Sequence, residues 1–150
     1  MKIALVAGGH LPIPPKGWGG VEHLIWNFHN QLKKIGDEVS IINTTSIDQI
    51  IENFDAVHLH YDQYANLMPK IKCNKRMVTS HYPYLENPEP QYTFLYDLLN
   101  TSESHIVCLS DRIKKEFLHR GSDSTNVSVL PCGIDVDSYA IDEESVLYPD

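Results

Sequence analysis

The sequence predicts one α/β domain with a Rossmann-like, three-layer αβα architecture and a mostly parallel sheet of about six strands. Six short apolar runs are spaced along the chain, and helical patterns separate them. Strands that alternate with helices are joined by right-handed crossovers, which build a parallel sheet covered on both faces. A chain of 150 residues is long enough to bury such a core without disulfides or structural metals.

The predicted strands are the apolar runs. They span residues 2–7, 38–42, 56–60, 76–80, 105–109 and 126–131. The first run is too short for the apolar core of a signal peptide and leads directly into glycine. It is therefore interpreted as a buried strand.

The clearest predicted helix runs from about Val21 to Ile35, because apolar residues recur there at helical spacing and Gly36 follows as a stop. Further helices are predicted over residues 46–54, 61–71, 88–100 and 110–121. The last of these has Ser110 or Asp111 as its N-cap.

Composition excludes several classes of protein. The formal net charge is −8 and the lysines and arginines are scattered, which argues against binding to duplex nucleic acid. No apolar run approaches the length of a membrane span, so no integral membrane segment is predicted. The three cysteines are odd in number and lack a CxxC spacing, which favours a reducing, cytoplasmic location.

Polar residues gather directly after the predicted strands. In an open parallel sheet, ligands bind beyond the carboxyl ends of the strands, where loops and helix starts converge. The polar residues at these positions include Glu22, His58, His60, Tyr61, Asp62, Thr79, Ser80, His81, Tyr82, Ser110, Asp111 and residues 131–135. One edge of the sheet is therefore expected to carry the site.

The pair Gly19-Gly20 lies where a loop meets the start of the first helix. Glycine lets the backbone approach a ligand, and a helix start offers free N–H groups, so this is a plausible seat for a diphosphate. The alternative is a tight turn in which Glu22 only complements the helix dipole. The stretch is neither a P-loop nor a dinucleotide fingerprint.

Histidines provide the other candidates. His58 and His60 project toward the same face of a strand and, with Asp62 or His81, form a possible metal site, although packing beneath a pocket is favoured. His81 follows a buried strand, where it can donate a hydrogen bond to a sugar hydroxyl or to developing charge. A loop histidine bonded to backbone is the alternative for His81. Cys132 is expected to be an inert small residue, because the sequence places no base beside it.

Four motifs, "GGVEH", "DAVHLH", "TSHYP" and "VLPCGID", occur in this order, one per strand end. As an ordered set, they resemble the N-terminal half of the family-four retaining glycosyltransferases of the GT-B type. The resemblance implies an acceptor-side domain over residues 1–139, half of a GT-B fold, followed by an acidic tail over residues 140–150. The C-terminal donor-binding domain of that family has no counterpart in these 150 residues.

The resemblance also implies residue roles. Gly19, Gly20 and Glu22 would lie at the donor diphosphate, and His81 would contact the donor sugar as the catalytic residue. The residues expected to line the substrate site are Trp18, His60, Asp62, Ser80, Tyr82, Ser110, Gly133 and Asp135. Cys132 replaces the asparagine of the family's "PNGID" turn.

The activity implied by the resemblance is transfer of a hexosyl unit from a nucleoside diphosphate sugar to a hydroxyl of a glycan or small-molecule acceptor, with retention. It implies no metal or other cofactor, and it implies a C-terminal half or a second copy as partner. The alternative is a catalytically silent module that binds a glycan or a partner protein. A metallohydrolase based on His58, His60 and His81 is the third hypothesis.

Overall fold

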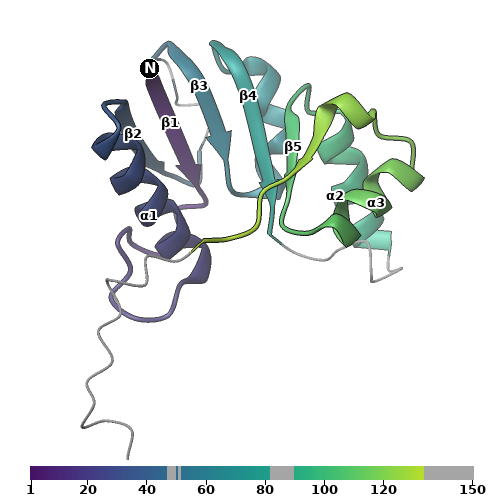
Figure 1. Ribbon diagram of the computed structural model, residues 1–150, viewed down its shortest axis with the longest axis horizontal. Helices are drawn as coiled ribbons and strands as arrows, with labels where there is room; N and C mark the ends of the chain where they lie inside the picture. Colours follow the sequence, from purple (N-terminus) through teal and green to yellow (C-terminus); the bar gives the residue numbers. More distant parts are fainter. Residues whose placement is uncertain (47–49, 51, 82–89, 134–150) are drawn as a thin grey trace, which may run out of the picture.

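The computed structural model describes residues 1–46, 50, 52–81 and 90–133, and these residues form an α/β fold around a six-stranded sheet (Figure 1). All five strand pairings are parallel. The elements are β1 (Lys2–Ala7), α1 (Gly20–Lys34), β2 (Glu38–Asn43), β3 (Phe54–Leu59), η2 (Asp62–Lys70), β4 (Cys73–Ser80), α2 (Pro90–Asn100), β5 (His105–Cys108), α3 (Asp111–His119), η4 (Ser124–Asn126) and β6 (Val127–Val129). The predicted Rossmann-like three-layer fold is confirmed.

The strand order is β2-β1-β3-β4-β5-β6. From β1, the chain adds β2 on one side of the sheet and then adds β3, β4, β5 and β6 in succession on the other side. A right-handed crossover in each direction places α1 on one face and η2, α2 and α3 on the opposite face. The connections therefore diverge at the carboxyl ends of β1 and β3, which is the topological switch point of the sheet.

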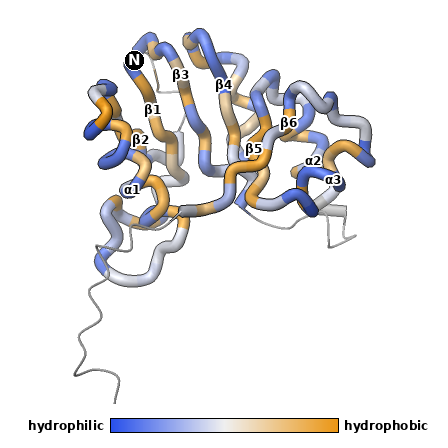
Figure 2. Tube along the Cα trace, viewed as in Figure 1, coloured by the Kyte–Doolittle hydropathy of each residue, from blue (hydrophilic) through white to orange (hydrophobic). Residues whose placement is uncertain are grey.

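Two apolar layers enclose the sheet because side chains alternate along each strand. Ala4 and Val6 face the layer that contains η2, α2 and α3, and Ile3 and Leu5 face the layer that contains Ile25 of α1. Figure 2 shows hydrophobic residues concentrated along β1 and β5, whereas β4 begins with hydrophilic residues. Burial on both faces explains why β1 and β5 appear in the sequence as nearly continuous apolar runs.

The helix predictions have mixed outcomes. α1 begins one residue before the expected Val21, and Ser110 is the N-cap of α3, where its Oγ accepts a hydrogen bond from the Ile113 backbone N–H at 3.3 Å. Residues 62–70 form a 3₁₀ helix that contains Pro69. The helix expected over 46–54 includes residues 47–49 and 51, which lie outside the described residues. In the part of the chain that is described, no helix is long and apolar enough to cross a bilayer.

Candidate functional site

A hollow of about 600 Å³ lies at the switch point of the sheet. Its walls come from the loop after β1, the first turns of α1, and the segments that follow β3, β4 and β6. The residues that line it are His10, Leu11, Trp18, Gly20, Val21, Glu22, Leu24, Tyr61, His81 and Cys132. The chain after β6 runs past the carboxyl ends of the strands toward α1 (Figure 1). Cys132, in this segment, lines the hollow.

The loop between β1 and α1 is held in place by two side chains. At the end of β2, the Asn43 amide accepts a hydrogen bond from the Gly9 N–H at 2.9 Å and donates one to the Leu11 carbonyl at 2.7 Å. At the other end of the loop, Nε2 of His23 donates to the Gly17 carbonyl at 3.0 Å. These bonds position the wall of the hollow that carries Trp18, whose side chain is 88% exposed.

Gly19 and Gly20 have different structural roles. Gly19 is the N-cap of α1 and adopts a backbone φ of 147°, which residues other than glycine rarely adopt. A Cβ atom there would also lie 3.1 Å from both Pro15 Cβ and Glu22 Oε2. Gly20 starts the helix, lines the hollow, and has nothing within 4 Å of the position of a Cβ atom. Only Gly20 therefore leaves its backbone open to the hollow.

Glu22 lies in the first turn of α1, where a carboxylate is stabilised by the helix dipole. Its side chain lines the hollow although the residue is only 9% exposed. Within the described part of the chain, its carboxylate has no ion pair or side-chain hydrogen bond. The helix start is thus already occupied by one negative charge.

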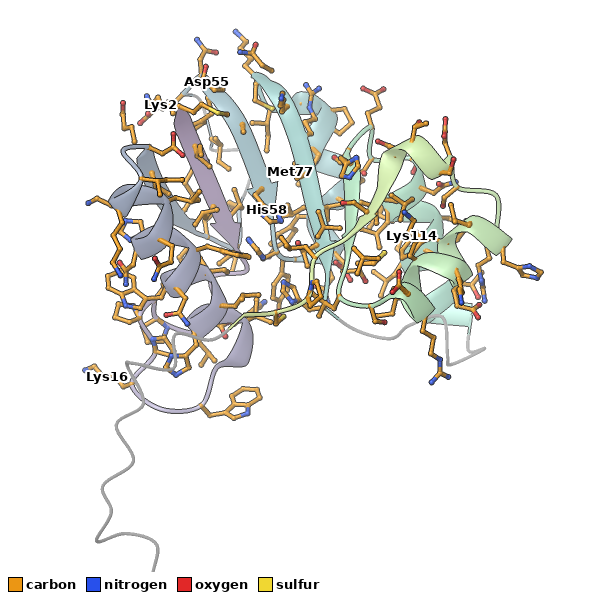
Figure 3. All side chains as sticks on the ribbon, in the orientation of Figure 1. Lys2, Lys16, Asp55, His58, Met77 and Lys114 are labelled. Atoms are coloured by element: carbon orange, nitrogen blue, oxygen red, sulfur yellow. The ribbon has the colours of Figure 1, made fainter. Side chains whose placement is uncertain are left out.

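Three histidine rings form a chain that leads to the hollow, in which His58 and His60 are buried and His81 is half-buried. His58 and His60 lie two apart near the end of β3 and share one face, with ring centroids 4.1 Å apart. Nε2 of His58 lies 2.6 Å from Thr79 Oγ1, and Nδ1 of His60 lies 3.1 Å from Nε2 of His81. Of the three, only His81 lines the hollow. Figure 3 shows His58 beside Met77 at the middle of the sheet.

Burial keeps these rings neutral. It lowers the pKa of His58 to about 4, with a smaller effect from the neighbouring His81, and it lowers the pKa of His81 to about 4. The pKa of His60 is also well below its usual value, because the ring is fully enclosed and lies beside two other histidines. At neutral pH, His81 therefore presents an uncharged imidazole to the hollow.

The hydrogen bond between His60 and His81 selects a tautomer for each ring, since one nitrogen must donate and the other accept. The Nε2 atom of His60 is buried and has no hydrogen-bond partner among the described residues. A buried N–H without a partner is rarer than a buried lone pair without one. The proton of His60 is therefore assigned to Nδ1, so that His60 donates to His81. His81 then carries its own proton on Nδ1.

The structure places the sequence-predicted residues in three groups. Trp18, Gly20, Glu22 and His81 line the hollow. Gly19 and His60 lie behind its wall. Away from the lining are Asp62 and Ser80, which are buried and joined by a 3.4 Å hydrogen bond, the α3 N-cap Ser110, and the exposed Gly133. Tyr82 and Asp135 lie outside the described residues.

Four lining residues, His10, Leu11, Val21 and Leu24, were not expected at the site from the sequence, and Tyr61 was expected at this edge but not in the lining. Tyr61 had a signal, because it directly follows a strand at the expected edge. Its ring lies 5.1 Å from that of His10 and packs against Gly8, where a Cβ atom would lie only 2.5 Å from it. The glycine after β1 is thus explained by the tyrosine after β3, a contact that the sequence does not reveal.

The chemistry available in the hollow is hydrogen bonding. Desolvation raises the pKa of the Cys132 thiol, which keeps it protonated and weakly nucleophilic. Among residues 1–46, 50, 52–81 and 90–133, no three His, Cys, Asp or Glu side chains are grouped so that they could hold a metal ion. The lining offers backbone N–H groups, one carboxylate, the imidazoles of His10 and His81, and the aromatic rings of Trp18 and Tyr61.

Comparison of the chain with protein-family models, with curated proteins and with solved structures finds no match. The fold and the hollow define a Rossmann-like α/β domain with a candidate ligand site at its switch point.

Proposed function

We propose that this chain is the acceptor-side half of a retaining glycosyltransferase that uses a nucleoside diphosphate sugar as donor. The observation that supports this proposal is the hollow at the switch point, where the open helix start at Gly20 and the neutral imidazole of His81 line one space. Ligands of open parallel α/β sheets bind at this place, and phosphates bind at helix starts.

In the proposed reaction, the bond between the anomeric carbon and the diphosphate oxygen breaks. A bond from the acceptor hydroxyl oxygen to the same face of that carbon forms, and the hydroxyl proton passes to the leaving diphosphate. Negative charge develops on the diphosphate, so fixed N–H donors at the start of α1 would stabilise the transition state. His81 would donate from its Nδ1 to a hydroxyl of the donor sugar. No step uses a metal.

The hollow supplies only part of what a diphosphate needs. None of the described residues that line it is Lys or Arg, and Glu22 adds a negative charge. The remaining positive charge would come from a partner, either a C-terminal half supplied in trans or a second copy of this chain. The proposal therefore includes such a partner.

The test is transfer or hydrolysis of a panel of nucleoside diphosphate sugars by the purified chain, with and without a candidate second-half protein. His81→Ala should lower the rate at least about tenfold, the low end for loss of one transition-state contact. His119→Ala, which changes an exposed histidine at the end of α3, is the matched control and should retain the wild-type rate. No turnover by the wild type under either condition would exclude the proposal.

A silent binding module is the second candidate, and the lack of a described Lys or Arg in the lining favours it. Such a module would bind a glycan or a partner protein without affinity for the nucleotide. Calorimetric titration separates the two functions: micromolar binding of a nucleoside diphosphate sugar supports the transferase, whereas glycan binding alone supports the module.

A further inference from the structure

The carboxylate of Glu22 is enclosed by the hollow without a partner of opposite charge. The residue is 9% exposed and lines the hollow, and no described side chain forms an ion pair or hydrogen bond with its carboxylate. A carboxylate that is largely shielded from bulk water gains from a partner that pairs with it or donates a hydrogen bond to it. A ligand group in the hollow is well placed to provide this compensation.

The start of helix α1 compensates only part of the negative charge of Glu22. The dipole of α1 favours a negative charge in its first turn, and Glu22 Oε2 is folded back to within 3.1 Å of where a Cβ atom on Gly19 would lie. The dipole does not supply a counter-ion for this carboxylate. A diphosphate at this helix start would therefore need positive charge from elsewhere to offset Glu22.

The described lining of the hollow includes one carboxylate, that of Glu22, and two imidazoles, those of His10 and His81. This described lining contains no Lys or Arg, and burial keeps His81 uncharged near neutral pH. Lys16 belongs to the same loop as Trp18, but it lies on the outer side of that loop, away from β3 and β4 (Figure 3). Leu11, Val21 and Leu24 reduce the local dielectric constant and strengthen the field of the carboxylate.

The remaining walls also suit a cation. Trp18 stands at the rim with 88% of its surface exposed, and Tyr61 forms another part of the lining. The faces of both aromatic types attract an ammonium group electrostatically. A neutral polyol would use the hydrogen-bonding groups and leave the negative charge uncompensated.

We propose that the hollow binds an amine-bearing, sugar-like ligand whose ammonium group pairs with Glu22. If the chain is the proposed transferase, this ligand is the acceptor, and that role rests on the proposed function. Its ammonium group then also offsets the negative charge of the donor diphosphate. Amine binding itself requires no transferase activity. The two proposals can therefore fail separately.

The experiment uses glucosamine as probe and N-acetylglucosamine as its uncharged match, titrated into the wild-type chain and followed by NMR at pH 6.5. The amine is protonated at this pH, and His81 is still neutral. Glucosamine should bind at least tenfold more tightly and should shift the resonances of Tyr61 and His81. Equal affinities, no glucosamine binding at 10 mM, or shifts confined to other regions would each overturn the proposal.

Variants test the role of the carboxylate. Glu22→Gln keeps the shape of the side chain and should remove the preference for glucosamine, whereas Glu116→Gln, at a half-buried position of α3 outside the lining of the hollow, should keep it. A preference that survives in Glu22→Gln would exclude Glu22 as the binding group. If amine binding is found and no sugar transfer occurs, the transferase proposal fails alone. If transfer occurs only to neutral acceptors, the amine proposal fails alone.

Discussion

Nδ1 of His60 and Nε2 of His81 lie 3.1 Å apart, so a buried histidine directly after β3 orients the one histidine of the cluster that reaches the hollow. The link joins residues 21 positions apart in the chain through the pairing of β3 with β4. It determines which nitrogen of His81 carries the proton, and thereby what His81 can offer a ligand.

The first prediction concerns that proton. At pH 7, ¹⁵N NMR of the imidazole rings should show His81 neutral and protonated on Nδ1, because His60 donates to its Nε2. In His60→Phe, which replaces the donor with a ring of similar size, a substantial fraction of His81 should shift its proton to Nε2. A wild-type His81 that is protonated on Nε2 would contradict the assignment.

The second prediction concerns stability against acid. Burial lowers the pKa of His58 to about 4 in the folded protein, whereas the unfolded chain has the usual value of 6.5. The unfolded state therefore binds more protons, and the free energy of unfolding should fall as the pH falls from 6.5 to about 4. The loss from His58 alone is on the order of 3 kcal/mol. Urea denaturation at several pH values measures it.

Two variants serve as controls for this pH dependence. His58→Gln can still hydrogen-bond to Thr79 and cannot titrate, so its unfolding free energy should depend less on pH. His119→Gln changes an exposed histidine and should follow the wild-type curve. An identical slope in His58→Gln and the wild type would show that His58 does not carry the effect.

The third prediction separates the two glycines at the start of α1. Gly19→Ala should lower the unfolding free energy by about 1–3 kcal/mol, because alanine is strained at φ 147° and its Cβ would crowd Pro15 and Glu22. Gly20→Ala should leave stability nearly unchanged, since its Cβ would meet no atom within 4 Å. Thermal or urea denaturation of both variants provides the comparison.

The same pair tests the diphosphate seat. If the backbone of Gly20 contacts the diphosphate as proposed, the added methyl group in Gly20→Ala should weaken binding of a nucleoside diphosphate sugar at least tenfold in calorimetry. Wild-type affinity in this well-folded variant would remove Gly20 from the diphosphate site.

The fourth prediction concerns the wall opposite α1. Gly8→Ala should displace the Tyr61 ring, because the new Cβ would lie 2.5 Å from it, and should lower the unfolding free energy by roughly 1–3 kcal/mol. Gly17→Ala is the matched control in the same loop, and its Cβ would have no neighbour within 4 Å. Chemical shifts of Tyr61 and His10 should change in the first variant and not in the second. Equal stability of both variants would contradict this packing.

The positions of the strands and the location of the site could be predicted from the sequence. Continuous apolar runs identified all six strands, and the period of two along a strand placed His58 and His60 on one face, as the structure confirms. The rule that ligands meet the carboxyl ends of parallel strands correctly indicated the edge that contains the hollow. These features depend on local periodicity and on chain connectivity, both of which are written in the sequence.

Which polar residues share a space was decided only by the tertiary structure. Ser80 and His81 are neighbours in the chain, yet Ser80 bonds to Asp62 away from the hollow while His81 lines it. Successive residues at a strand end point to opposite faces, so adjacency in the sequence does not predict a shared site. Tyr61 and Cys132 reach the hollow from distant parts of the chain, and burial is the main reason that the three histidines are neutral. Packing and desolvation depend on the whole fold, and no local pattern encodes them.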